Sequence, residues 1–435
     1  MPQRIVIIGS GFAGFWAALS ARRLISLQLE SGPQPKAAAA VEVIVVAPDA
    51  NLVMRPRLYE AGPASMSAPV DDIYRACGVE FVHGIVDAIR AADREIDVVG
   101  RTTGVRSTMR YDKLVLAAGS QVVRPEIPGL GEHAFSVDQL EDAVKLENHL
   151  QSLPSIPASR ARNTFVVCGG GFTGIEVATE LPARLRAILG EKQDIRVVIV
   201  ERGQDVGPDL GAGPRPHIVK ALEDLKVESR LGSAVVSIDA SGVTLASGEH
   251  IKTLTAIWTA GVFATPLTKQ IPGEKDNFGR LHVDTDLRVP SVPDIFVAGD
   301  AVSAAADDSG HCTKMSCQHA TPLGKIAGHN AAAELLNIPR LSYAQPVYRC
   351  CLDLGPAGAV VGEGWDLQVQ YVGPEAKPMK RFINTSLIYP PKADPDLAFA
   401  AADPAFDGSD PAINHPTLNQ YLREHGIPIQ PSGVH

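Results

Sequence analysis

Short, unbroken apolar runs alternate with helix-compatible stretches along the first 200 residues. The runs are Ile5–Ile8, Val41–Val46, Phe165–Cys168 and Ile195–Val200. A helix-compatible stretch ending near Leu29 separates the first two runs, and another ending near Leu189 separates the last two. Continuous β-branched runs separated by helices are typical of parallel sheets covered on both faces. The pattern therefore predicts two doubly wound α/β units.

A glycine-rich turn follows the first strand of each unit and opens its helix. The turns are Gly9-Ser10-Gly11-Phe12-Ala13-Gly14 and Gly169-Gly170-Gly171-Phe172-Thr173-Gly174. In this GxGxxG spacing the first glycine allows a tight turn, the second lets the backbone approach a pyrophosphate, and the third lets the helix pack closely. The helix N-terminus then faces the phosphates. Each turn thus predicts a dinucleotide site.

The residue at the end of the second strand in each unit usually binds the ribose hydroxyls of the dinucleotide, and it is usually acidic. Glu201 occupies this place in the second unit. Its carboxylate would repel a 2′-phosphate, so NADH is favoured over NADPH, although the neighbouring Arg202 could offer that phosphate a partner. The first unit has Ala47 there, so either Asp49 or backbone groups and water hold its ribose. Because Arg202 could bind the 2′-phosphate, the sequence leaves NADPH open as a second electron donor.

The length and the prolines indicate how the chain is divided. At 435 residues it is too long for one compact core, so two or three domains are expected. The prolines of Arg124–Gly129 suit a crossing between domains, and Ser31–Ala40 suits a surface insertion. From about Tyr389 the prolines multiply and helical periodicity is lost, so we expect an extended tail.

Composition and charge narrow the function. The net charge of −9 argues against nucleic acid or an anionic membrane as the main partner. No run reaches the roughly 18 to 20 apolar residues that span a bilayer, and no export signal precedes Ile5, so a cytoplasmic protein is expected. The few cysteines suit a reducing compartment as free thiols. No cluster has the spacing of metal ligands, so no metal site is predicted.

Three further motifs complete the pattern, namely Leu116–Gly119, Trp258–Val262 and the run Ile295–Asp300, which ends in Gly-Asp. With them the chain resembles the flavoproteins that have two dinucleotide-binding domains, the pyridine nucleotide-disulfide oxidoreductase superfamily, over about residues 4–340. The resemblance implies FAD at the first glycine turn and NADH or NADPH at the second. Asp300 would then bind the ribityl or pyrophosphate region of FAD.

This resemblance implies an α/β fold of two Rossmann-like dinucleotide-binding domains, the second inserted in the first, followed by a C-terminal α+β domain. The FAD domain would comprise residues 1–125 and 283–342, and the NAD(P)H domain residues 126–282. Residues 343–435 would form the C-terminal domain with its proline-rich tail.

Within the superfamily the chain is most similar to type II NADH dehydrogenases and apoptosis-inducing-factor-like reductases. Arg55–Glu60 resembles the segment beside the flavin ring, and Thr173–Glu176 resembles the motif that brings a glutamate near the stacked rings. Without the resemblance, Glu176 would be a solvated helix residue. The FAD-binding residues implied are Gly9, Gly11, Phe12, Ala13, Gly14, Asp49, Arg55, Pro56, Val86, Ala118, Gly119, Gly299, Asp300, Pro322 and Leu323. Those implied for NAD are Gly169, Gly171, Phe172, Thr173, Gly174, Glu176, Glu201, Arg202, Ala260 and Gly261.

The stretch Cys317–Gly324 is similar to the helix start that lines the quinone site of type II dehydrogenases, but Pro322 and Leu323 replace its two glutamines. The helix start can still direct its amide dipoles at the flavin. No amphipathic membrane anchor is evident after Tyr389, which favours a soluble acceptor over a membrane quinone. The candidate catalytic residues are Glu176, Cys317, Gln318 and His319.

Some of these residues have a second interpretation. His319 could relay protons to an acceptor or lie on a helix surface. Cys312 and Cys317 have the spacing of a redox pair but stand in a different place from the disulfide of the superfamily, so we expect two reduced thiols. Cys350 and Cys351 are expected in a strand of the C-terminal domain.

The leading hypothesis is an FAD-dependent enzyme that passes hydride from NADH to flavin and then reduces a quinone-like or other small acceptor. One alternative is a reductase for a ferredoxin- or rubredoxin-type carrier. Another is a redox-sensing flavoprotein with slow turnover, whose NADH-bound state alters its dimerisation or its binding of partners. A thiol or sulfide oxidase that uses Cys317 is a minor option. The sequence leaves open whether the protein forms a homodimer.

Overall fold

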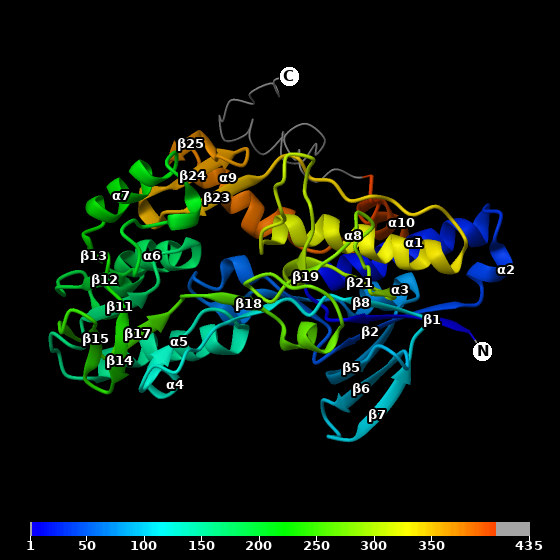
Figure 1. The fold of residues 1–435 in the computed structure, drawn as a ribbon. Coiled ribbons are helices and arrows are strands. Elements are labelled where there is room, and N and C mark those ends of the chain that lie inside the picture. The colour runs from blue at the N-terminus through cyan, green and yellow to red at the C-terminus, as the bar shows by residue number, and fades with distance from the viewer. Residues whose placement is uncertain (1, 406–435) are drawn as a thin grey trace.

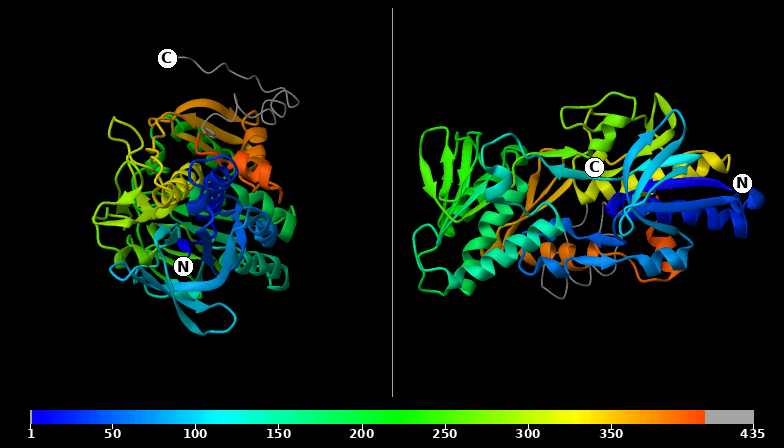
Figure 2. Two further views of the ribbon diagram at one scale, coloured as in Figure 1. Left: turned by 90° about the vertical axis from the view of Figure 1, so that its right-hand side faces the viewer. Right: turned by 90° about the horizontal axis from the view of Figure 1, so that it is seen from below.

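A computed structural model describes residues 2–405 of the chain (Figure 1). The end of the predicted C-terminal domain, with Pro411 and Pro416 of the proline-rich tail, lies outside the described residues. The right-hand view of Figure 2 shows an elongated molecule, in which the elements coloured blue and those coloured green form opposite ends.

The first sheet has eight strands in the order β20-β21-β8-β1-β2-β5-β6-β7. Its parallel centre consists of β21, β8, β1, β2 and the start of β5, and the remaining strands pair antiparallel at the edges. Since β21 pairs with β8, chain beyond residue 290 returns to the sheet that the N-terminus begins. The strands are β1 (Gln3–Ile8), β2 (Val41–Ala47), β5 (Glu80–Arg90), β6 (Glu95–Gly100), β7 (Arg106–Arg110), β8 (Lys113–Leu116), β20 (Arg288–Val289) and β21 (Val292–Val297).

Two long helices, α1 (Phe12–Glu30) and α8 (Cys317–Leu335), lie side by side over this sheet (Figure 1). Their backbones touch because α8 has glycine at two positions one turn apart. A Cβ added at Gly324 would lie 2.2 Å from the Ala13 oxygen, and one added at Gly328 would lie 2.0 Å from the Ala17 oxygen. The N-terminus of α8 is thereby fixed next to the first glycine turn.

The second sheet has five parallel strands in the order β10-β17-β11-β12-β13. The apolar run at 165–168 and the run at 195–200 form its centre, as predicted. Its elements are β10 (Ala134–Phe135), β11 (Thr164–Cys168), β12 (Arg196–Val200), β13 (Val227–Arg230), β17 (Thr255–Trp258), α5 (Leu140–Ser152), α6 (Phe172–Leu189) and α7 (Arg215–Asp224). A small antiparallel sheet of β14 (Val235–Asp239), β15 (Gly242–Leu245) and β16 (His250–Lys252) flanks it.

The chain passes between the two sheets twice, and the two passages pair with each other. β9 (Ser120–Val122) lies antiparallel to β18 (Val262–Ala264). The Val123 amide donates to the Gly261 oxygen at 2.9 Å, and Trp258 Nε1 donates to the Val123 oxygen at 2.8 Å. These bonds lie at or just after the two motifs Leu116–Gly119 and Trp258–Val262, at the points where the chain passes from one sheet to the other.

A three-stranded antiparallel sheet follows, made of β23 (Arg349–Asp353), β24 (Ala359–Glu363) and β25 (Gln368–Gly373). Cys350 and Cys351 lie in β23, as predicted. Next come α9 (Lys377–Phe382) and a π-helical turn at Ile383–Leu387. The mixed α/β fold is confirmed, while the domain boundaries stay predictions.

The expected extended tail is wrong over residues 395–401, which form helix α10 (Pro395–Ala401). Asp394 caps this helix by accepting a hydrogen bond from the Leu397 amide at 3.0 Å, and proline at the first helical position suits its start. The helix packs against α1 and α3 (Asp71–Cys77), and Arg23 of α1 pairs with Asp403 just after it. Fewer than two complete turns give no visible periodicity, which explains the error.

The remaining short elements are α2 (Pro35–Ala38), α4 (Leu130–His133), β3 (Asn51–Val53), β4 (Ser67–Pro69), β19 (Leu281–His282) and β22 (Val302–Ser303). The first of them lies within the predicted surface insertion at 31–40. Across residues 2–405, no helix has the length and apolar character needed to cross a membrane.

Candidate active site

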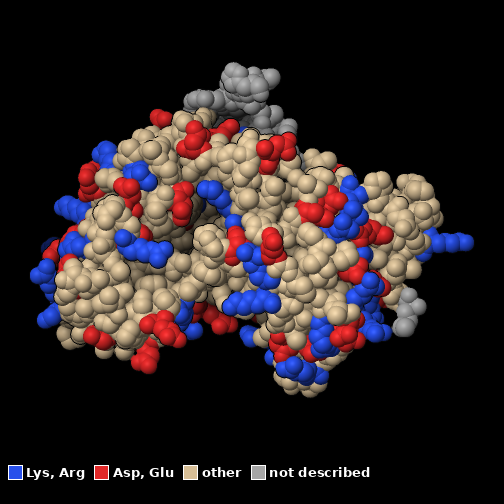
Figure 3. All heavy atoms as spheres, in the orientation of Figure 1, with Lys and Arg blue, Asp and Glu red and all other residues tan. Residues whose placement is uncertain are grey.

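One continuous pocket of about 3050 Å³ runs between the two large sheets and under the C-terminal sheet. Figure 3 shows the molecule hollowed between its two ends, with both signs of charge interspersed over this face. Both glycine turns, the start of α8 and the inner side of α9 line the pocket. Because ordinary small-molecule pockets measure roughly 300–1,000 Å³, this space can hold more than one large ligand.

The first glycine turn has the geometry that its spacing predicts. Gly9 has φ +109°, a conformation that residues with a side chain rarely adopt. A Cβ added at Gly11 would meet nothing within 4 Å, whereas one at Gly14 would lie 2.0 Å from the Gly9 oxygen. No side chain caps the N-terminus of α1. The turn therefore leaves free amides and open space for an anion at the pocket wall.

The second glycine turn repeats this arrangement, and Glu201 is fixed beside it. A Cβ added at Gly171 would meet nothing within 4 Å, and one at Gly174 would lie 1.9 Å from the Gly169 oxygen. The Glu201 carboxylate accepts hydrogen bonds from the Gly170 amide at 2.7 Å and the Gly203 amide at 2.8 Å. The acidic residue at the strand end thus lines the pocket in a fixed orientation.

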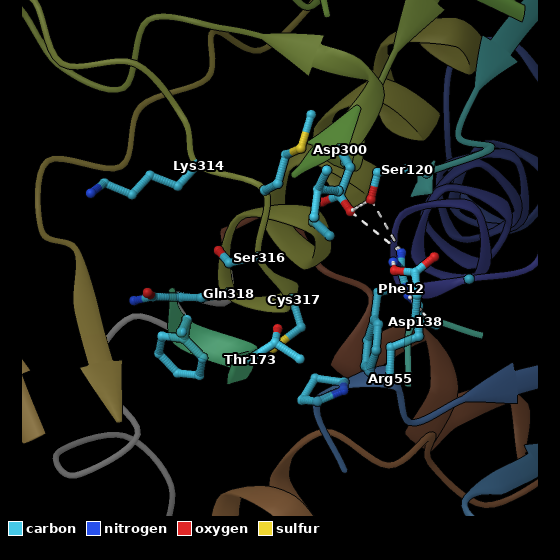
Figure 4. Close-up of a pocket in the computed structure, with 18 of the residues that line it drawn as sticks. Phe12, Arg55, Ser120, Asp138, Thr173, Asp300, Lys314, Ser316, Cys317 and Gln318 are labelled. Atoms are coloured by element: carbon cyan, nitrogen blue, oxygen red, sulfur yellow. Dashed lines mark hydrogen bonds and ion pairs between the residues drawn. The ribbon is translucent and has the colours of Figure 1, made fainter. Parts of the chain in front are cut away.

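Arg55 joins three segments that are distant in the sequence (Figure 4). Its guanidinium lies 2.5 Å from Asp138 Oδ1 and 3.6 Å from Asp300 Oδ2. Ser120 Oγ donates to Asp300 Oδ2 at 2.6 Å. Asp138 and Ser120 were missed by the sequence reasoning, since Arg55, which they share as a partner, lies 83 and 65 residues away and no local pattern marks them.

Glu176 and Lys380 form a buried ion pair on the pocket wall. Lys380 Nζ lies 2.9 Å from Glu176 Oε1, and the Asp353 amide donates to the same oxygen at 3.0 Å. Burial raises the pKa of Glu176 to about 7, although Lys380 opposes the shift. Burial lowers the pKa of Lys380, but the charge of Glu176 and its neighbours outweighs this and the net shift is upward. Glu176 is therefore not a solvated helix residue.

Asp353 connects this ion pair to two other parts of the molecule. Tyr59 Oη donates to Asp353 Oδ2 at 2.9 Å, and Lys377 Nζ lies 2.5 Å from Asp353 Oδ1. Asn384 Nδ2 donates to Tyr59 Oη at 3.3 Å. Burial and nearby carboxylates raise the pKa of Tyr59 above its ordinary value. The network fixes α6 against the C-terminal sheet and the segment that begins at Arg55.

The start of α8 is held by its own side chains. Ser316 Oγ accepts a hydrogen bond from the His319 amide at 3.4 Å, and Gln318 Oε1 accepts one from the Arg349 amide at 3.2 Å. Cys317 and Gln318 line the pocket. Burial raises the pKa of Cys317 to about 11, so it is a neutral thiol near pH 7. All six cysteines lie in the described part of the chain and are free.

His319 lies in the interior, with no exposed surface. Its ring stacks on Tyr348 with centroids 5.3 Å apart, and burial lowers its pKa to about 4. The expectation of a helix-surface histidine is therefore wrong. The imidazole is neutral near pH 7 and does not itself line the pocket, but Ser316 Oγ, which does, lies 3.2 Å from its Nδ1. A proton relay through His319 stays a prediction.

The pocket brings together most of the residues predicted for the two dinucleotides. Gly14 and Gly174 lie behind the turns, where they pack helix against strand, and Leu323 is buried on the inner side of α8. The predicted residues that do line the pocket are Gly9, Gly11, Phe12, Ala13, Asp49, Arg55, Pro56, Val86, Ala118, Gly119, Gly169, Gly171, Phe172, Thr173, Glu176, Glu201, Arg202, Ala260, Gly261, Gly299, Asp300, Cys317, Gln318 and Pro322. Within residues 2–405, no group of three His, Cys, Asp or Glu side chains could hold a metal ion.

The chain is similar to several known proteins. It is 44% identical over 404 residues to an NADH dehydrogenase-like protein of Mycobacterium tuberculosis, covering 92% of this chain and 98% of that protein. It is 29% identical over 391 residues to the demethylphylloquinone reductase of Synechocystis, covering 87% and 91%. The NDH2 of Plasmodium falciparum, solved in complex with NADH, superposes with a TM-score of 0.72 over 99% of this chain and 100% of that chain at 14% identity. This last likeness is one of fold alone.

The sequence profile of pyridine nucleotide-disulphide oxidoreductases matches residues 3–324, which include both glycine turns and the Gly299-Asp300 motif. The superfamily inferred from the motifs is thus confirmed, and so is the prediction of an oxidoreductase. The chain belongs to the pyridine nucleotide-disulphide oxidoreductase family, as an FAD-dependent enzyme that uses a pyridine nucleotide.

Proposed function

We propose that this protein is an NADH:acceptor oxidoreductase that reduces a quinone-like small molecule. One observation carries the proposal: two open glycine turns face a single pocket, and a buried Glu176–Lys380 pair lies on its wall. The NADH dehydrogenase-like relative and the demethylphylloquinone reductase support this donor and this class of acceptor.

The residues present fit two dinucleotides. The uncapped N-terminus of α1 and the open face of Gly11 would hold the FAD pyrophosphate, with Asp300 and Ser120 near the ribityl chain. The N-terminus of α6 also lacks a side-chain cap and would hold the NADH pyrophosphate, with Glu201 on the adenosine ribose. Bound FAD would supply the two-electron redox chemistry that links the nicotinamide to the acceptor.

The overall reaction consumes one proton besides the hydride: NADH + H⁺ + quinone gives NAD⁺ + quinol. Glu176 is suited to hold that proton, because its pKa of about 7 lets it exchange near neutral pH. Both of its hydrogen bonds go to Oε1, so Oε2 is the atom for the proton. Lys380 and the Asp353 amide fix the carboxylate at the pocket wall.

We also propose the cytoplasm as the compartment. All six cysteines are free, two of them neighbours in one strand, and free thiols persist where the surroundings are reducing.

Mixing the purified flavoprotein with NADH under anaerobic conditions tests the donor. We expect the flavin absorption to bleach with NADH and to return when a soluble quinone is added. Glu201→Gln should raise the KM for NADH about tenfold, because the carboxylate that would bind the adenosine ribose is lost. The KM for NADPH should change less, because the same carboxylate repels the 2′-phosphate. The exposed Glu223→Gln is the matched control. A flavin that stays oxidised with both nucleotides would refute the proposal.

A further inference from the structure

Four aromatic rings form a cluster beside the start of α8, in which His319, Tyr348 and Trp365 are mutual neighbours. His311 and Trp365 lie parallel, with centroids 4.6 Å apart. Trp365 stacks on Tyr348 at 5.6 Å, and Tyr348 stacks on His319 at 5.3 Å. The cluster borders a smaller pocket through His311 and Trp365 and the main pocket through Tyr348. His311 and Trp365 are partly exposed while Tyr348 and His319 are buried, so a planar aromatic ligand would meet the cluster at its two outer rings.

Lys314 lies where the two pockets meet. It lines both of them, and its Nζ lies 5.1 Å from the centre of the Tyr348 ring. In Figure 4 its side chain extends on the side of the pocket away from Arg55 and Asp138. Across the described residues, no carboxylate lies within ion-pair distance of this ammonium group. Asp366, the carboxylate on the smaller pocket, instead accepts a hydrogen bond from Gln368.

Two arginines lie near Lys314, each paired with a carboxylate: Arg349 with Glu363 and Arg280 with Asp276. A third carboxylate, that of Asp307, accepts a hydrogen bond from His311. Arg349 pairs through Nε with Glu363, but its buried Nη1 has no hydrogen-bond partner in the part of the chain that the structure describes. Burial is the main cause of the lowered pKa of His319, and the positive charges of Lys314 and Arg280 lower this pKa further. The N-terminus of α8 adds a partial positive charge. An anion entering here would meet the ammonium group of Lys314, which has no ion pair among residues 2–405, and the free Nη1 of Arg349.

We propose that the passage formed by Lys314, Tyr348, Trp365 and His311 selects a planar aromatic acceptor that carries a negatively charged substituent. The rings hold the plane of the acceptor, and the ammonium group of Lys314 binds the substituent. This inference rests on the proposed function, because the acceptor is reduced as above by one hydride equivalent from NADH and one proton. The charged substituent is a binding group and is unchanged by the reaction.

Steady-state kinetics with a matched pair of acceptors tests this. The probes are 1,4-naphthoquinone-2-sulfonate and uncharged 1,4-naphthoquinone, with rates normalised to bound flavin. In Lys314→Gln the ratio of kcat/KM for the charged over the uncharged quinone should fall about tenfold relative to the wild type, since hydrogen bonds between charged groups contribute on the order of that factor or more. Lys314→Arg should restore most of the ratio, and the exposed Lys36→Gln should leave it unchanged.

The possible failures are distinguishable. A wild-type enzyme that reduces both quinones, with a ratio that Lys314→Gln does not change, overturns the inference and leaves the proposed function standing. A wild-type enzyme that is reduced by NADH but reoxidised by neither quinone overturns the quinone-like acceptor of the proposed function itself.

Discussion

At the scale of single residues, the Glu176–Lys380 pair combines two properties that seldom occur together. It is almost fully buried, yet Glu176 has a pKa close to neutrality and an oxygen free to carry a proton. Burial of a carboxylate raises its pKa and a nearby cation lowers it, so the value near 7 is a balance of the two. Perturbed groups of this kind in a cleft are candidates for acid–base work.

Replacing Glu176 with Gln should slow the reduction of the acceptor about a hundredfold, because a positioned proton donor contributes roughly that factor or more. In the wild type the carboxyl is protonated below pH 7, so the rate of acceptor reduction should fall as the pH rises through 7. The variant should lose this dependence. Glu180→Gln, one turn further along α6 and outside the pocket, is the control. An unchanged pH profile in Glu176→Gln would exclude the assigned role.

At the scale of elements, the parts predicted well are those fixed by local pattern. The strands and helices around Gly9–Gly14 and Gly169–Gly174 follow from short apolar runs and glycine spacing, and their bounds agree within a few residues. Lys380 and Asp138 could not be predicted, because their partners Glu176 and Arg55 are about 200 and 80 residues away. The chemistry of these side chains depends on packing that one sequence does not reveal.

The contact between α1 and α8 leads to a prediction on stability. Gly328→Ala would place a methyl group 2.0 Å from the Ala17 oxygen, so one helix must move. Overpacking of this kind costs about 1–3 kcal/mol. We expect a Tm lower by roughly 2–10 °C, measured by circular dichroism. Gly131→Ala, where an added Cβ meets nothing within 4 Å, should leave the Tm nearly unchanged. Equal Tm values for the two variants would contradict the close approach of the helices.

At the scale of the whole molecule, the Arg55–Asp138 pair links two parts of the pocket. Arg55 lies on the side of the first glycine turn, and Asp138 lies in the segment through which the chain crosses to the second sheet. Asp138 also accepts a hydrogen bond from the Val122 amide at 3.0 Å, next to the paired crossings. Both bonds thus set how the two ends of the pocket face each other. Hydride transfer depends steeply on such alignment, since a misplacement of about 1 Å can cost a factor of 100.

Asp138→Ala should therefore slow the reduction of bound flavin by NADH by about tenfold, with less effect on the amount of flavin bound. Stopped-flow absorption would give the rate, and the visible spectrum of the purified protein would give the flavin content. Asp142→Ala, in the nearby helix α5 and outside the pocket, is the control. Loss of flavin without a change in the rate per flavin would show that Asp138 acts on binding alone.

The order of strands in the first sheet also has a consequence for biosynthesis. β8 ends at Leu116, but its neighbour β21 starts at Val292 and α8 ends at Leu335. A ribosome that adds about 5–20 residues per second needs on the order of ten seconds or more to supply them. During that time the edge of β8 that pairs with β21 and the side of α1 that packs against α8 have no native cover. We therefore expect the nascent chain to need shielding until residues 292–335 have emerged.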